Sequence, residues 1–128
     1  MIESSAPVLA VREDLRNTTD LLAERVRLHP EHVAFRVRRG GAWRDVTTRE
    51  FAGDVLRLAR GLLSVGVATG DAVVIMAATR YEWAVADLAS WCAGGVVVPI
   101  YPTSSVAQAA AILADAAPVL AIVGGDAE

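Results

Sequence analysis

The sequence predicts an α/β fold in which an N-terminal β-hairpin and a helix lead into a three-stranded parallel sheet of β-α-β-α-β order. Residues 33–38 alternate apolar and polar side chains, the pattern of a half-buried strand, and Gly40-Gly41 supply a turn before a second strand at 43–47. Three later segments are apolar without alternation and are separated by helical patterns: residues 72–77, 96–100 and 119–123. Strands of this kind are typical of parallel sheets that helices cover.

The chain begins with an aperiodic stretch. We expect residues 1–18 to be a loosely ordered lead-in to one domain portion that occupies residues 19–128. Residues 20–28 have the spacing of a short amphipathic helix, which ends before Pro30 because the residue preceding a proline is driven out of the helical region. The candidates for its N-cap are Asn17, Thr18 and Thr19.

Each later helix is predicted to begin at a capping box, in which a Ser or Thr side chain and a Glu or Gln three residues later bind each other's backbone amides. The pairs are Thr47/Glu50, Thr79/Glu82 and Ser105/Gln108. In the first of these helices, Phe51, Val55, Leu58, Ala59, Leu62 and Leu63 share the predicted buried face, and Gly66 follows as the C′ residue.

The helix predicted over residues 80–93 is apolar most of the way round. Its polar positions 82, 87 and 90 do not gather on one face. Such a helix is normally buried on several sides, which three strands cannot achieve. We infer that this segment sits inside something larger or in an oligomer.

Composition narrows the function classes. The 128 residues include twelve basic and fifteen acidic side chains, and a net charge of -3 argues against a general nucleic-acid binder. No uninterrupted apolar run reaches the length of a membrane span, and the first ten residues lack the basic and apolar regions of a signal peptide. Cys92 is the single cysteine, so no internal disulfide forms, and a reducing cytoplasmic setting is expected.

Polar residues follow two of the predicted parallel strands, where ligands gather in open α/β sheets. Thr103 and Ser104 open one helix, whose N-terminus attracts anions, although capping by Ser105 alone accounts for much of this pattern. Arg80 stands in the first turn of another helix, where a cation is unfavourable. This position indicates either a carboxylate or phosphate ligand or an ordinary salt bridge.

The two histidines, the cysteine and the remaining glycine pairs are weak candidates for a functional site. His29 and His32 lack a third ligand at metal-binding spacing, so we interpret them as solvated loop residues. Cys92 lies on the apolar helix and is expected to behave as a small hydrophobe. The glycine pairs at 94–95 and 124–125 match no phosphate-binding motif and are expected at turns.

A set of short strings, taken in order, resembles the start of long-chain fatty-acid–CoA ligases, which are adenylate-forming, AMP-binding synthetases. The strings are WRDVTTRE (43–50), ARGLL (59–63), GV followed by GD (66–71), TRYEW (79–83), DLA (87–89) and GGVVVPIYPTSS (94–105). The resemblance covers residues 19–128. It implies a fatty acid, ATP with Mg²⁺ and CoA as substrates and cofactors, and a chain that continues into a much larger domain.

The same resemblance places the chemistry elsewhere. The family's phosphate loop, adenine-contacting aromatic, magnesium-binding glutamate, ribose-binding aspartate and catalytic lysine have no match here and are expected beyond Glu128. The family loop that matches Tyr101, Pro102 and Thr103 lies near the CoA entrance, so these residues are expected there, with Arg80 and Ser104 as substrate contacts. The 128 residues alone are therefore predicted to be inactive and to bind no cofactor tightly.

Two alternatives stay open at this point. One is a stand-alone α/β module that binds an acyl group or a partner chain through its apolar helix. The other is a structural fragment that dimerises through exposed apolar surface. Peripheral membrane contact fits a fatty-acid enzyme, but no basic amphipathic helix in the sequence supports it.

Overall fold

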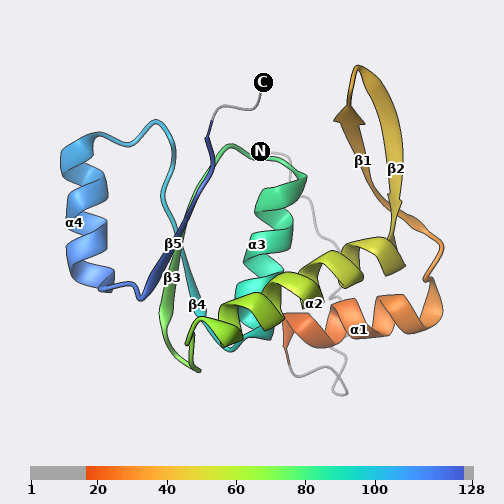
Figure 1. Ribbon diagram of the computed structural model, residues 1–128, viewed down its shortest axis with the longest axis horizontal. Helices are drawn as coiled ribbons and strands as arrows, with labels where there is room; N and C mark the ends of the chain where they lie inside the picture. Colours follow the sequence, from red (N-terminus) through yellow and green to blue (C-terminus); the bar gives the residue numbers. More distant parts are fainter. Residues whose placement is uncertain (1–16, 126–128) are drawn as a thin grey trace, which may run out of the picture.

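The computed structural model describes residues 17–125, which form a hairpin, packed helices and a three-stranded sheet (Figure 1). In chain order the elements are α1 (Thr18–Leu28), β1 (Val33–Arg39), β2 (Ala42–Thr47), α2 (Thr48–Ser64), β3 (Ala72–Met76), α3 (Tyr81–Cys92), β4 (Val96–Pro99), α4 (Val106–Ala116) and β5 (Leu120–Val123). The predicted fold class is confirmed. The lead-in predicted for residues 1–18 lies outside the described residues, apart from its last two.

Asn17 begins α1, as one of the three predicted caps. Its side chain accepts a 3.0 Å hydrogen bond from the backbone amide of Asp20, and the Asp20 carboxylate accepts one of 3.3 Å from the Asn17 amide. This reciprocal pair is a capping box that the sequence analysis did not predict here, because it uses Asn and Asp instead of Thr and Glu.

The hairpin rises from the start of α2 in Figure 1. Its strands are antiparallel, and Arg38 lies opposite Trp43. Gly40 and Gly41 make the turn at φ angles of 56° and 81°, which suit glycine because it has no Cβ. The inner face carries Phe35, whose ring centroid lies 4.7 Å from that of Phe51 on α2. The base of the hairpin is thereby packed into the core.

α2 begins at the predicted capping box. The Glu50 carboxylate accepts a 2.8 Å hydrogen bond from the Thr47 amide, and the Thr47 hydroxyl accepts one of 3.2 Å from the Glu50 amide. Gly66 follows the helix at φ 98°, the predicted C′ geometry. The predicted buried face is correct for Phe51, Val55, Ala59 and Leu62. It was wrong for Leu63, which is exposed because it lies at the edge of that face, near the helix end.

α3 corrects the second predicted capping box. Its N-cap is Arg80, without any side-chain cap, instead of Thr79. Arg80 has extended backbone angles of φ -152° and ψ 178°, so the helix starts one residue later than predicted. Glu82 is then the second helical residue and its carboxylate cannot fold back onto a Thr79 amide. It lies instead 3.4 Å from Arg80 Nε.

The sheet has the strand order β4-β3-β5, and both pairings are parallel. The central strand is buried, with Val73 and Ile75 fully inaccessible. Within residues 17–125 the helices leave the outer two strands partly uncovered, since Val96 of β4 is 53% exposed and Val123 of β5 is 68% exposed. Within residues 17–125, only β3 has neighbours on every side.

α4 begins at the third predicted box, where the Gln108 amide donates a 3.2 Å hydrogen bond to the Ser105 hydroxyl. None of its residues is buried. Figure 1 shows it on the side of the sheet opposite α3. The core therefore lies between α2, α3, the hairpin base and β3, and the α4 side of the molecule is thinly covered.

Candidate functional site

The parallel strands deliver three loops to one edge of the sheet. β3 leads into residues 77–80, β4 into 100–105 and β5 into 124–125, and Figure 1 shows all three at the same edge. The loops are in close contact there. The Gly124 amide donates to the Met76 carbonyl at 2.9 Å, and a Cβ added at Gly124 would lie 2.6 Å from the Ala77 Cβ. This edge is where α/β proteins of this class bind ligands.

The loop that contains Tyr101, Pro102 and Thr103 is held at its base and open at its tip. Ile100 is buried, and its amide donates a 3.0 Å hydrogen bond to the Ile75 carbonyl. Tyr101 is 76% exposed, and its carbonyl accepts a 2.9 Å hydrogen bond from the Ser104 amide. The loop therefore presents an aromatic ring and a hydroxyl to solvent from a fixed base.

Ser105 caps α4, which was the alternative to a role in ligand binding. Its amide donates a 2.9 Å hydrogen bond to Gln108 Oε1, in addition to the bond that its hydroxyl accepts. Ser104 is half-buried, and among residues 17–125 its hydroxyl makes no hydrogen bond that would occupy it. Within residues 17–125, the Ser104 hydroxyl therefore stays available to a ligand, as does that of Thr103.

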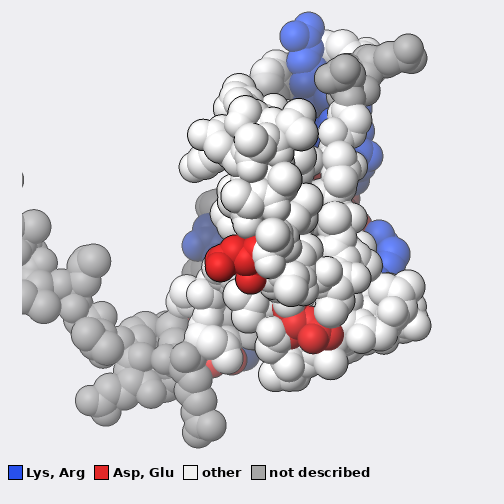
Figure 2. Space-filling view, turned by 90° about the vertical axis from the view of Figure 1, so that its left-hand side faces the viewer, with Lys and Arg blue, Asp and Glu red and all other residues white. Residues whose placement is uncertain are grey.

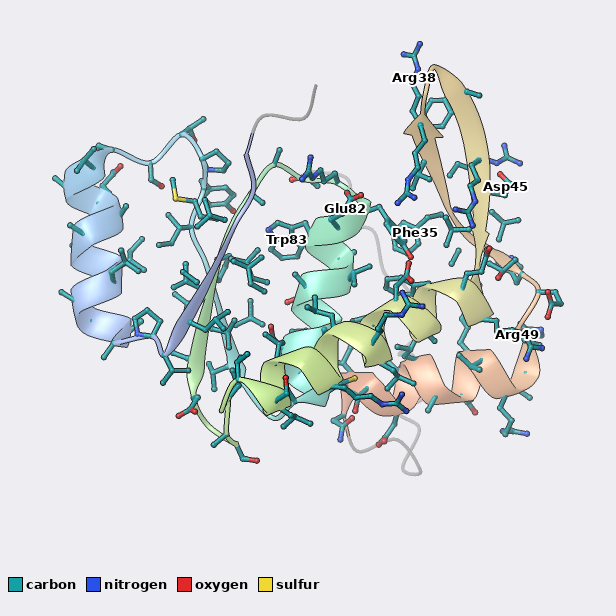
Figure 3. The ribbon with its side chains drawn as sticks, viewed as in Figure 1. Phe35, Arg38, Asp45, Arg49, Glu82 and Trp83 are labelled. Carbon is teal, nitrogen blue, oxygen red and sulfur yellow. The ribbon has the colours of Figure 1, made fainter. Side chains whose placement is uncertain are left out.

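Arg80 takes part in the salt bridge that was one of its two interpretations. Its Nε lies 3.4 Å from Glu82 Oε2, and Arg39 Nη2 from the hairpin lies 3.7 Å from Glu82 Oε1. Figure 3 shows Glu82 at the first turn of α3, beside the lower part of the hairpin. In the part of the chain that is described, no hydrogen bond or ion pair joins Arg80 to the 100–105 loop.

A partly buried polar contact at the junction of α2 and α3 was missed by sequence reasoning. The Tyr81 hydroxyl donates a 2.7 Å hydrogen bond to Asp54 Oδ2, and Arg57 Nη1 lies 2.7 Å from Asp54 Oδ1. The Tyr81 bond, followed by Arg57, lowers the pKa of Asp54. Burial, followed by the Asp54 carboxylate, raises the pKa of Tyr81. No local spacing links residues 27 positions apart, so no sequence signal could have found this pair.

Two adjoining clefts open beside that contact. Their volumes are about 670 and 490 Å³, and both are lined by Arg39, Asp54, Arg57 and Tyr81. The larger also has an apolar wall that includes Val85 and Ile122. Two arginines and two carboxylates, those of Asp54 and Glu82, balance at its rim, so it lacks the cationic excess of a phosphate site.

The arrangement of residues 17–125 does not support metal binding or nucleophilic catalysis. This part of the chain holds no group of three His, Cys, Asp or Glu side chains placed to bind a metal ion. His32 Nδ1 lies 3.1 Å from Arg25 Nη2, in the exposed loop predicted for it. Burial raises the pKa of Cys92, which disfavours the reactive thiolate.

Among the helices described, none has the length and apolar character needed to cross a bilayer.

Comparison with known proteins gives the same scaffold. A long-chain-fatty-acid–CoA ligase of Mycobacterium bovis, FadD15, is 41% identical over 120 residues, which is 94% of this chain and 20% of that protein. A 3-[(3aS,4S,7aS)-7a-methyl-1,5-dioxo-octahydro-1H-inden-4-yl]propanoyl:CoA ligase of Mycobacterium tuberculosis is 35% identical over 87% of this chain and 21% of its own length. The chain thus spans about a fifth of the length of these two ligases.

Solved structures agree. The N-terminal subdomain of NpsA from Klebsiella oxytoca superimposes with a TM-score of 0.78 at 25% identity, covering 89% of this chain and 29% of that chain. The sequence model of the AMP-binding enzymes matches residues 22–128. The hairpin, the α2–α3 pair and the parallel sheet therefore form the N-terminal scaffold of an adenylate-forming enzyme, and the chain belongs to the AMP-binding enzyme family.

Proposed function

We propose that this chain is the N-terminal part of a long-chain fatty-acid–CoA ligase, and that residues 19–128 form an incomplete portion of its AMP-binding domain. The enzyme joins a fatty acid to ATP, giving acyl-AMP and pyrophosphate, and the CoA thiol then displaces AMP. The identity of 41% over 94% of the chain to a ligase of this specificity carries the proposal. The same match favours it over a stand-alone acyl- or partner-binding module.

ATP, Mg²⁺ and CoA belong to the proposed enzyme as a whole. The described residues do not fit the nucleotide or the metal. They offer no carboxylate cluster for Mg²⁺, and the larger of the two clefts that they line has a rim of balanced charge. The role assigned to residues 17–125 is therefore to position loops at the carboxyl edge of the sheet, and no chemical step is assigned to their side chains.

The loop after β4 is proposed to lie at the CoA entrance. Tyr101, Pro102 and Thr103 are all exposed on a base that Ile100 fixes, as a surface that receives a flexible cofactor requires. Ser104 and Arg80, which lie on neighbouring loops, are proposed to contact substrate. The Ser104 hydroxyl makes no hydrogen bond within residues 17–125. In the complete enzyme, Tyr101→Ala should raise the KM for CoA several-fold and leave the KM for ATP unchanged. An equal rise in both would contradict the assignment.

A cytoplasmic location is part of the proposal, and the single half-buried cysteine supports a reducing compartment. Homodimerisation and peripheral membrane contact stay predictions. Sedimentation of the complete enzyme, with and without anionic vesicles, checks both. A monomer that does not pellet with the vesicles would exclude them.

The proposed activity is tested by comparing two proteins. One is the 128-residue chain, and the other is the polypeptide read through and beyond Glu128. With palmitate, ATP-Mg and CoA, the longer protein should release AMP and the 128-residue chain should not. AMP release by the 128 residues alone, or an open reading frame that stops at Glu128, would overturn the proposal.

A further inference from the structure

Charge is distributed unevenly along this chain. Every arginine lies at or before Arg80, the chain has no lysine, and residues 81–125 carry only the acidic residues Glu82, Asp87 and Asp115. Figure 2 shows the consequence on the α4 side, where the face is mostly uncharged and basic side chains appear only at its margins. Protein surfaces that meet water normally mix both signs of charge. This half of the molecule therefore has the character of a surface that another part of a protein covers.

One stripe on α3 is more specific. Trp83, Asp87 and Trp91 recur every four residues and so share one side of the helix. Val85 and Ala89 are buried on another side, in the core cluster that includes α2. Trp83 is half-buried, and Figure 3 draws it on the side of α3 toward the strands. Trp91 is 38% exposed. We call these three residues the outer stripe.

The polar member of the outer stripe has no partner in the described structure. Within residues 17–125, Asp87 makes no hydrogen bond and no ion pair, although it is half-buried. Burial alone raises its pKa. A carboxylate in that position destabilises the fold unless a donor reaches it. The indole rings of Trp83 and Trp91 lie one helical turn before and after Asp87, and the face of an indole ring attracts a cation.

These features define the chemistry of the missing partner. A guanidinium or ammonium group would pair with Asp87 and stack on an indole, while the apolar part of its side chain would cover the rest of the stripe. Residues 81–125 contain no such cation. Arg80, which precedes them, is already paired with Glu82.

We propose that the outer stripe is the docking site for an arginine- or lysine-bearing segment from the later part of the same polypeptide. This inference rests on the proposed function, which makes the chain the first fifth of a longer enzyme. Two observations favour this occupant. The two CoA ligases compared above have about four fifths of their length outside the matched region. α3 also packs beside β4, an edge strand whose outer side is unpaired within the described sheet.

A second copy of the chain fits less well. A two-fold contact through this face would bring residues 81–125 of both copies together, and neither would supply a cation to Asp87. The segment of residues 1–16 does contain arginines, so it is kept as an outcome of the test.

The test is the sign of the effect of Asp87→Asn on the melting temperature in two contexts. In the 128-residue chain, removing an unpaired half-buried charge should leave Tm unchanged or raise it. In the complete enzyme, the same change should lower Tm by about 2 °C or more, because it breaks a covered ion pair. Asp115→Asn, which changes an exposed acid on α4, is the control in the 128-residue chain and should have no effect there.

Three results would overturn the proposal: a rise or no change of Tm in the complete enzyme, an equal fall in both proteins, or the absence of any polypeptide beyond Glu128. If Asp87→Asn lowers Tm in the 128-residue chain and deletion of residues 1–16 abolishes that effect, the occupant is the N-terminal segment and the proposal also fails. The readout is independent of activity. If the complete enzyme shows the expected change in Tm but does not activate palmitate, the proposed substrate is contradicted and the proposed docking site is still supported.

Discussion

The Tyr81 hydroxyl donates a 2.7 Å hydrogen bond to Asp54 Oδ2 and thereby joins the first turn of α3 to the middle of α2. Tyr81 is 8% exposed, and its ring makes an edge contact with Phe35 of the hairpin at 5.3 Å between centroids. One side chain therefore ties together three elements that are distant in sequence. The contact sets the position of α3, and with it the loops at the edge of the sheet.

Replacing Tyr81 with Phe should destabilise the chain by about 1–2 kcal/mol, because it removes a hydrogen bond to a charged acceptor and keeps the ring. Urea unfolding followed by tryptophan fluorescence measures the change. Asp54→Asn and the double variant complete a mutant cycle. Additive effects of the two substitutions would contradict the assigned interaction.

The two threonines that sequence reasoning treated alike should behave differently. Thr47→Ala removes a side-chain cap and should cost about 1 kcal/mol of unfolding free energy. Thr79→Ala should cost close to nothing, since Thr79 caps no helix. Chemical denaturation of both variants checks this contrast. Equal losses at the two positions would show that α3 begins at Thr79 after all.

Stability should fall in acid in a way that depends on Asp54. The Tyr81 hydroxyl and Arg57 hold its pKa below the unfolded value, so its contribution is complete above about pH 4 and is lost as pH falls through the folded pKa. The difference in unfolding free energy between the wild type and Asp54→Asn should therefore shrink from pH 5 to pH 3. A difference that stays constant over that range would contradict the account.

Two glycines should respond to alanine with opposite signs. Gly94 has φ 86°, and an added Cβ would lie 2.7 Å from Thr69 Oγ1, so Gly94→Ala should cost about 1–3 kcal/mol. Gly61 lies within α2, with open space around it, and Gly61→Ala should gain about 0.5–1 kcal/mol from helix propensity. Thermal unfolding of both variants measures the two changes in stability. Stabilisation by Gly94→Ala would contradict the geometry of the α3–β4 turn.

Most of the fold could be predicted because its signals are local. Apolar alternation, unbroken apolar strands and two capping boxes are patterns of neighbouring residues, and each gave the right element. The box at Thr79 failed because the extended backbone of Arg80 delayed the start of the helix, which residue spacing alone cannot reveal. The exposure of β4 and β5 was also missed. Apolar strands signal that they are to be covered but do not say which part of the protein covers them.

The candidate site was only partly predictable. The 100–105 loop was found from its place after a strand and before a capped helix, and the structure shows its exposed tip. The Tyr81–Asp54 contact was out of reach because it depends on how α2 and α3 pack. The apolar character of α3 predicted that it belongs inside something larger or in an oligomer. Asp87, which has no partner within residues 17–125, makes that expectation specific.

The most direct test of the central claim is to detect palmitoyl-CoA by mass spectrometry after incubating the complete enzyme with palmitate, ATP-Mg and CoA. The account predicts palmitoyl-CoA and AMP in equal amounts, no product when either ATP or CoA is left out, and none from the 128-residue chain. Failure of the complete enzyme to form an acyl-CoA from any long-chain fatty acid would contradict it.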